Sequence, residues 1–389
     1  MTKISILFSL IFVSFIGFAQ KSTPIAVRNY IRMPKDTVES KLLVDNLNSL
    51  LEAAQGKNEM NHWILPSQKM ETYILMDEIN GIEKSRGLKD NHFFKPYLTN
   101  IVALPQNQYL IQFSYIGVFD SLPHLKASFE VIAHKNKDRF LFSSPLVRNT
   151  TSWKSKQYGA FIFHFSDSLN EANVLEFTEK AALFDRKLNN TNTGITEIYC
   201  CENRTALLKL IGVNYKMKVN GLVGGVYSSG ADGKGLQVSG EGASFGHVDV
   251  HDLWHDRLSM VKSRRKVNKP VDEGIAYLYG GSWGMTWEEI LSRFKKEVAS
   301  NPATDWREIK ENPLNFGVSR AKHLMADYVI NALLVQKIEK EHGFAGVWKL
   351  LDCGVKEKGN ENYYRVLEQL TGISKENYNE KIGELISQN

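Results

Sequence analysis

Two histidines stand four residues apart in the segment HDLWH at 251–255, and the carboxylate of Asp252 follows the first of them. On an α-helix, residues four apart lie on one face about one turn apart, so the two imidazoles could bind one metal ion. A hydrolytic zinc site takes three protein ligands and keeps a fourth position open. His251 and His255 are therefore candidate ligands, and a third ligand should come from another element.

The candidate for the third ligand is Glu273, which lies 18 residues after His255 near the start of a second apolar, helical pattern. Gly274 beside it would let two helices approach closely, because glycine has no side chain. Ten histidines in 389 residues make one such pair weak evidence by itself. The pair together with Asp252 after its first histidine and Glu273-Gly274 downstream is much harder to explain by chance.

This arrangement resembles the gluzincin class of zinc metallopeptidases, in which H-E-x-x-H is followed some 18 to 20 residues later by a glutamate. In the aminopeptidase N branch that glutamate lies in an N-E-G-x-A context, and DEGIA at 272–276 is similar. The resemblance implies that His251, His255 and Glu273 bind Zn²⁺. The spacer between His255 and Glu273 is 17 residues, one fewer than the aminopeptidase norm.

One departure from the family concerns Asp252, which stands where gluzincins have their general-base glutamate. In that chemistry the metal acidifies water and the carboxylate takes the proton. Aspartate is one methylene shorter, and a misplacement of roughly an ångström can cost on the order of a hundredfold in rate. Two functions therefore remain open: a peptidase that hydrolyses peptide bonds by zinc-activated water, and a catalytically inactive homologue that binds peptides or proteins.

The resemblance also implies supporting residues. Related enzymes use a tyrosine or histidine of a later helix to stabilise the oxyanion, and Tyr328 and His323 are candidates on a helix expected over 318–340. Core packing is the alternative role of Tyr328. The strand expected over 235–239 would be the edge strand that holds an extended peptide by backbone pairing.

Neighbouring polar residues leave alternatives open. His247 precedes His251 by four, so a register of His247 with His251 is conceivable, although it puts Val248 at the base position. The whole stripe could also be a polar helix face capped by Asp249 and Asp252. Asp256 and Asp272 could each hold the free nitrogen of a liganding imidazole or could be plain surface charge.

The chain is expected to be an α+β protein with a signal peptide and two domains. Residues 1–20 combine Lys3, an apolar run and a small residue before Gln20, which is the layout of a secretory signal. Residues 21–150 predict a small α+β domain, with a helix over 41–55 and hairpins over 97–116 and 125–143. A cone-shaped sheet similar to the nuclear-transport-factor-2 type is one form of it.

The metallopeptidase resemblance covers 158–385, so we expect a thermolysin-like, peptidase-MA-like domain over 158–389 after a linker at 145–156. Its upstream half should be mixed α/β, and its C-terminal half should be all helical. The expected elements before the histidine pair are strands and helices over 161–165, 170–188, 195–201, 204–211, 222–227 and 235–239.

Composition limits the compartment and the partners. The signal predicts a periplasmic or secreted protein without stable membrane insertion once the signal is removed. The net charge of +5 is mild, and the basic segment KSRRK at 262–266 is expected to be a solvated loop rather than a nucleic-acid site. Peptide or protein substrates are the expected partners. An oxidising compartment permits one disulfide among Cys200, Cys201 and Cys353 but the sequence does not require it.

Overall fold

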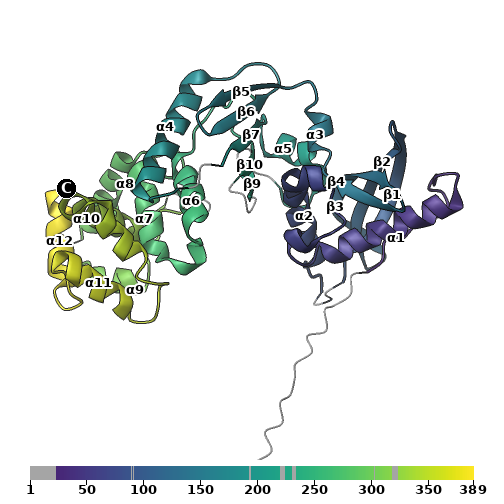
Figure 1. Ribbon diagram of the computed structural model, residues 1–389. Helices are drawn as coiled ribbons and strands as arrows, with labels where there is room; N and C mark the ends of the chain where they lie inside the picture. Colours follow the sequence, from purple (N-terminus) through teal and green to yellow (C-terminus); the bar gives the residue numbers. More distant parts are fainter. Residues whose placement is uncertain are drawn as a thin grey trace, which may run out of the picture. The chain divides into compact units, whose positions relative to one another are not determined.

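The computed structural model describes residues 23–88, 90, 92–191, 194–219, 224–229, 234–301, 303–317 and 323–389. The expected signal segment, 1–20, lies outside these described residues. The chain is α+β, with two β-sheets and two compact units (Figure 1). One unit comprises Met1–Thr151 and Leu208–Asn220, and the other comprises Ser152–Leu207 and Gly221–Asn389.

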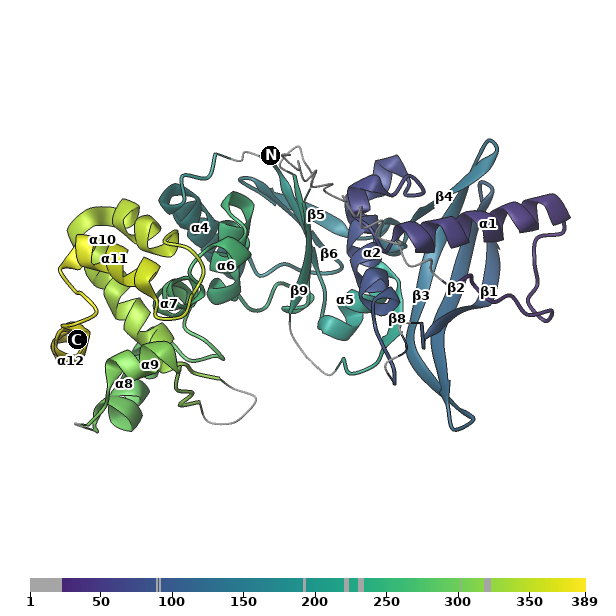
Figure 2. The same cartoon turned by 90° about the horizontal axis from the view of Figure 1, so that it is seen from below.

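The first unit contains an antiparallel sheet whose first four strands follow chain order. These strands are β1 (Lys95–Leu104), β2 (Gln108–Phe119), β3 (Leu122–Asn136) and β4 (Arg139–Ser143). The two expected hairpins are therefore confirmed. Helices α1 (Thr37–Ala53) and α2 (Lys69–Glu83) pack against β4, and Figure 2 shows them beside the sheet. Short helical turns complete the unit at Asn58–Met60, Pro66–Gln68 and Leu146–Asn149 (α3).

Helix α1 begins earlier than its apolar spacing predicts. Asp36 caps it, because the Asp36 side chain accepts from the backbone N–H groups of Val38 and Glu39. The expected apolar stripe is buried, with Leu43, Leu47, Leu50 and Leu51 all in the core. The helix α2 was not expected from the sequence, although its buried face packs in the same way.

The first unit also takes in a segment from far along the chain. Strand β8 (Val213–Lys216) pairs with β3, and the carbonyl of Gly212 accepts from the backbone N–H of Glu130 at 2.7 Å. The expected division placed this segment with the C-terminal domain. Its four residues do not indicate which sheet it joins, because strand pairing depends on tertiary contacts.

The second unit contains a mixed sheet in the order β5-β6-β7-β10-β9. Its strands are β5 (Lys154–Tyr158), β6 (Phe161–Phe165), β7 (Thr196–Cys200), β10 (Gly235–Ser239) and β9 (Gly225–Ser229). Strands β6, β7 and β10 run parallel, while β5 and β9 add antiparallel edges. The expected linker at 145–156 is therefore wrong in part. It contains α3 and the start of β5, whose side chains are almost all exposed and so show no apolar face.

One expectation about the position of a β-strand needs correction. The strand at 235–239 is β10, and it lies between β7 and β9 rather than at the edge. The edge strand on that side is β9. Both strands were expected, but their order in the sheet depends on pairing that local sequence does not specify.

Helices dominate the rest of the second unit. In chain order they are α4 (Glu171–Lys187), α5 (Arg204–Ile211, which straddles the division of the units), α6 (Val250–Val261), η3 (Arg264–Lys266), α7 (Lys269–Gly280), α8 (Trp287–Phe294), η4 (Lys295–Ala299), α9 (Trp306–Glu311), α10 (Ala326–Leu351), α11 (Glu361–Thr371) and α12 (Tyr378–Gln388). Among the described residues, no helix combines the length and the apolar character needed to cross a membrane.

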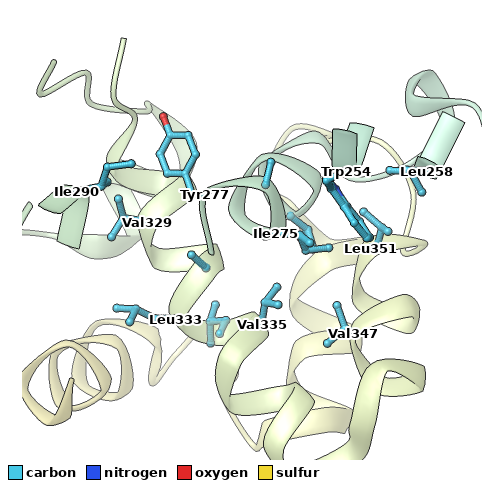
Figure 3. Packing of buried hydrophobic residues seen from close by; sticks show 14 of the residues in the cluster. Trp254, Leu258, Ile275, Tyr277, Ile290, Val329, Leu333, Val335, Val347 and Leu351 are labelled. Carbon is cyan, nitrogen blue, oxygen red and sulfur yellow. The ribbon is translucent and has the colours of Figure 1, made fainter. Parts of the chain in front are cut away.

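The core of this unit holds α6 and α7 in place. Figure 3 shows buried apolar side chains of α6, α7 and α10, among them Trp254, Ile275 and Leu351, in one cluster. Gly274 permits the contact of α7 with α10, since a Cβ there would lie 2.8 Å from Ala332 N. Gly280 permits the contact with α6, since its Cβ would lie 2.3 Å from His251 N. The close helix approach expected at Gly274 is confirmed.

The three cysteines are free thiols: Cys200 and Cys201 are buried, and Cys353 is half-buried. Burial raises the pKa of Cys200 and of Cys201 to about 12. Two of the thiols therefore act as small apolar core groups.

Candidate metal centre

Helix α6 presents the two histidines. Asp249 is its N-cap, and its side chain accepts from the backbone N–H of Asp252 at 3.0 Å. The helix begins at Val250, so His247 lies before it and does not share the helical stripe. The notion of three histidines on one helix face is therefore wrong, because the cap fixes the start of the helix after His247.

The side chains of His251, His255 and Glu273 converge on one point. The two Nε2 atoms are 3.2 Å apart, and each lies 3.6 Å from Oε2 of Glu273. Zinc binds such atoms at about 2.0–2.2 Å with tetrahedral angles, which places ligand atoms roughly 3.4 Å from one another. Among the described residues, this is the only group of three or more ligating side chains whose donor atoms lie within 4.8 Å of one another. The cluster could hold a metal ion.

Each imidazole is oriented through its other nitrogen. Nδ1 of His251 donates to the carbonyl of Gly281 at 2.7 Å, and Nδ1 of His255 donates to Oδ1 of Asp272 at 3.0 Å. Since a carbonyl and an ionised carboxylate only accept, both Nδ1 atoms carry the proton and a neutral ring offers its Nε2 lone pair. Gly281 suits its place because its φ is +66° and a Cβ would lie 1.9 Å from Met285 O.

Asp272 is the central supporting group. It is 1% exposed, and besides His255 it accepts from Trp254 Nε1 at 3.0 Å and from Arg264 Nε at 2.7 Å. Of its two expected roles, the imidazole partner is confirmed and the surface charge is wrong. Asp256 contacts neither liganding imidazole through a hydrogen bond in the described part of the chain. Burial raises its pKa to about 6.

Arg264 belongs to the site as well. Its Nη2 donates to Oε1 of Glu273 at 3.0 Å and lies 3.2 Å from Nε2 of His255. The expectation of a solvated basic loop is therefore wrong for this residue. No spacing signal in the segment KSRRK marks Arg264, since its role depends on how η3 folds back between α6 and α7.

The metal-free cluster is strongly polarised. Burial opposes the charged form of Glu273, but the imidazoles of His251 and His255, each 3.6 Å from its Oε2, outweigh burial and hold the pKa of this carboxyl well below its usual range. Burial also opposes protonation of His255. The hydrogen bond to Asp272 and the nearby carboxylate of Glu273 prevail, and they raise the pKa of His255 to about 9. The imidazole of His255 lies near the carboxylates of Asp272 and Glu273, which explains the direction of this shift.

The cluster opens into a cleft of about 890 Å³, which His251 and Glu273 line. The three predicted catalytic residues, Asp252, His323 and Tyr328, line the same cleft. They come from different elements, since Asp252 is on α6 and Tyr328 is on α10. The structure therefore brings two of the three predicted ligands and the predicted catalytic groups to one cleft, while His255 lines a smaller neighbouring cavity.

His323 does not lie on the helix expected over 318–340. Helix α10 begins only at Ala326, and residues 318–322 lie outside the described residues. The side chain of His323 instead approaches Asn315, with 2.8 Å between Nδ1 and Nδ2 of the amide. Its backbone carbonyl accepts from Trp283 Nε1 at 3.0 Å. The helix was expected to begin at 318, but it begins eight residues later, at Ala326.

Tyr277 is a cleft residue that the sequence did not single out. Its ring lies between those of His251 and Tyr328, at centroid distances of 5.9 and 5.6 Å. It follows Glu273 by four residues, so helical spacing was a usable signal. Burial raises the pKa of Tyr277 to about 12 and the pKa of Tyr328 further, so both hydroxyls stay protonated and can donate.

Asp252 projects into the cleft and accepts no hydrogen bond within the described part of the chain. Desolvation by the cleft walls raises the pKa of its carboxyl, and the nearby charge of Asp249 adds to the effect. A carboxylate with a raised pKa and free oxygens is suited to accept a proton from water.

Comparisons with protein-family models, with curated proteins and with solved structures find no match for this chain.

Proposed function

We propose that this protein is an exported, zinc-dependent peptidase of gluzincin type, acting on peptides or proteins. The observation that carries the proposal is the convergence of His251, His255 and Glu273 at 3.2–3.6 Å beside a cleft that also holds a free carboxylate. The residues present fit a zinc ion, because two imidazoles and one carboxylate are a common ligand set of hydrolytic zinc sites. A zinc ion held there would act as a Lewis acid that polarises a carbonyl and makes water more acidic.

The chain's own residues divide the remaining work. Asp252 would take a proton from the attacking water and pass it to the leaving amine, because its oxygens are free and its pKa is raised. The hydroxyl of Tyr328 would donate to the oxygen of the substrate carbonyl as negative charge develops there. His323, which precedes α10 in the chain, is a second candidate donor in the same cleft.

The supporting contacts keep this geometry fixed. Gly281 and Asp272 orient the imidazole planes, and Trp254 of the same helix is fully buried and donates from Nε1 to Asp272. Such orientation matters because a displacement of about an ångström at a catalytic group can cost on the order of a hundredfold in rate.

A second candidate function is supported by the identity of residue 252. The shorter side chain of Asp252 favours a protein that binds metal and peptide without cleaving it. In that case the cluster would have a structural role, and the cleft would be a binding groove.

Metal analysis of the purified protein tests both candidates. We expect about one equivalent of zinc, lost in His251→Ala and retained in the matched control His247→Ala, whose imidazole lies outside the cluster. Less than about a tenth of an equivalent in the unaltered protein, after incubation with zinc, would overturn the proposal.

The variant Asp252→Glu then separates the two functions. If the protein is a weakened peptidase, the longer carboxylate should raise cleavage of an unstructured protein such as casein by up to about a hundredfold. Absence of cleavage by both forms, with zinc bound in each, would favour the binding protein.

A further inference from the structure

A second, smaller cavity lies next to the metal cluster, between strands β9 and β10 and the start of helix α6. Its volume is about 220 Å³, which is enough for one long side chain. Gln237 and Ser239 line it from β10, whose alternation places these two residues on one face of the sheet. Val238, between them, is fully buried.

The wall of this cavity carries an excess of negative charge. Four carboxylates line it, from Glu241, Asp249, Asp252 and Asp256. Of the described residues that line it, Arg264 is the one lysine or arginine, and its guanidinium already binds Asp272 and Glu273. The imidazoles of His247 and His255 also line the cavity, but none of the four carboxylates pairs with a lysine or arginine in the described part of the chain.

Several polar atoms in the wall have no partner. Ser239 is 1% exposed, and its Oγ makes no hydrogen bond within the described part of the chain. Oε2 of Glu241 is likewise buried and unpaired, while Oε1 accepts from the backbone N–H of Gly224 at 3.0 Å. Buried polar atoms normally have partners, so these two indicate a donor that comes from outside.

A metal ion does not explain the four carboxylates. They form no group of donor atoms within 4.8 Å of one another among the described residues, whereas the histidine cluster does. Acceptors that are spread along a narrow cavity suit an elongated organic cation, whose donors reach several oxygens and whose methylenes lie along Phe177 and Leu253.

The position of the cavity suggests how such a cation would arrive. Glu241, Asp249 and Asp252 line both this cavity and the larger cleft of the metal cluster, so the two spaces are neighbours. Strand β9 is the outermost strand of its sheet, and an extended peptide can pair with such an edge. Residues of a paired peptide point alternately towards and away from the sheet's face.

We propose that the 220 Å³ cavity is a specificity subsite that binds the basic side chain, lysine or arginine, of a peptide lying along β9. The proposal rests on the proposed peptide-binding function. The ammonium or guanidinium donates to Glu241, Asp256 and Ser239, and no covalent step is involved.

Peptide binding tests the proposal without requiring activity. The probes are two fluorescently labelled hexapeptides of alanine, acetylated and amidated at their ends, with one central residue that is either lysine or norleucine. At physiological salt we expect the lysine peptide to bind about tenfold or more tightly, the gain of one good charge-assisted hydrogen bond. Equal affinities of the two peptides would overturn the subsite.

Two variants locate the preference. Glu241→Gln keeps an oxygen for the Gly224 N–H, and Asp256→Asn keeps its shape, so both should fold while the preference for lysine falls to about threefold or less. Glu288→Gln, on the exposed start of α8, is the matched control and should leave the preference intact. A full preference in both cavity variants would place cation recognition elsewhere and would overturn the proposal.

Failure of the subsite is distinguishable from failure of the proposed function. The peptide titrations are run on zinc-loaded and on chelator-treated protein, with metal content measured in parallel. A lysine preference without any zinc binding would support the subsite and contradict the zinc peptidase. Zinc binding without a lysine preference would contradict the subsite and leave the zinc peptidase supported.

Discussion

Two clusters of charged side chains lie in the second unit, and they differ in what they face. His251, His255 and Glu273 turn their ligating atoms towards one point beside a cleft. Lys310 and Asp327 form an ion pair that is 0% exposed, with 3.1 Å between Nζ and Oδ1. Both clusters place charge inside the protein, but only the first leaves its oxygens and nitrogens directed at space that an ion could occupy.

The second cluster is enclosed in the core, although Oδ2 of Asp327 has no hydrogen-bond partner in the described part of the chain. Lys310 Nζ lies 3.7 Å from the centroid of the Tyr363 ring, and Asn331 donates to Oδ1 of Asp327 at 3.0 Å. Tyr363 in turn donates to Asn331 at 2.9 Å. Burial lowers the pKa of Lys310 and raises the pKa of Asp327, so each partner depends on the other for its charge. We interpret this cluster as structural, joining α9 to α10.

The comparison teaches that perturbed pKa values alone do not mark a functional site. Both clusters have them, since burial and ion pairing shift titration wherever they occur. Convergence of donor atoms and access to a cleft are the properties that set the histidine cluster apart. Changes to one cluster at a time should separate effects on stability from effects on metal binding.

Removal of Lys310 should have the largest effect on stability. Lys310→Met leaves the Asp327 carboxylate buried and unpaired, so we expect the free energy of unfolding to fall by about 3–5 kcal/mol. The double variant Lys310→Met, Asp327→Leu should recover most of the loss. Urea denaturation measures the stability, and zinc content should be unchanged in both variants that fold. A loss of zinc from the folded double variant would mean that the two clusters are not independent.

Removal of a ligand should have the largest effect on metal affinity. His255→Ala deletes one of three donors, and we expect zinc affinity, measured by competition with a chromophoric chelator, to fall by more than about a hundredfold. His247→Ala serves as control, because this histidine lies before the helix. Comparable losses in both variants would point to a different ligand set.

Loss of the supporting carboxylate should have an intermediate effect. Asp272→Asn removes the charge that faces Nδ1 of His255, and we expect zinc affinity to fall by about 10- to 100-fold. Asp256→Asn is the matched control, since Asp256 makes no hydrogen bond to a liganding imidazole in the described part of the chain. An unchanged affinity in Asp272→Asn would mean that the orientation of His255 does not depend on this charge.

The pH dependence of stability should change sign with metal. In metal-free protein the pKa of His255 is raised from an ordinary value of 6.5 to about 9. Its contribution to stability is therefore fully present below about pH 6.5 and is lost as the pH rises to about 9. With saturating zinc, stability should instead rise from about pH 6, because only the neutral imidazole binds metal. Thermal denaturation in both states measures this, and the His255→Gln variant should flatten the metal-free curve.

The sequence predicted the ligands better than their surroundings. His251 and His255 were candidates because of helical spacing, which fixes neighbours without knowledge of the rest of the fold. Glu273, on another helix, was a candidate because of the resemblance to the gluzincin pattern. Asp272 was identified as a candidate because it adjoins a ligand. Arg264 and the carbonyl of Gly281 were not, since each reaches the site through a turn whose path depends on tertiary packing.

The fold shows the same division. The hairpins of the first unit and the helices α1, α4 and α6 follow from local patterns of apolar residues and caps. The place of β9 at the sheet edge and the pairing of β8 with β3 are choices among strands distant in the chain. Short strands carry too little pattern to specify a partner, so these features became visible only in three dimensions.

The most direct test of the central claim is X-ray diffraction from crystals of the protein grown with zinc, with data collected on both sides of the zinc absorption edge. We predict one strong anomalous peak within about 2.0–2.2 Å of Nε2 of His251, Nε2 of His255 and an oxygen of Glu273. A map without a peak at these three atoms, from protein that is folded and exposed to excess zinc, would contradict the account.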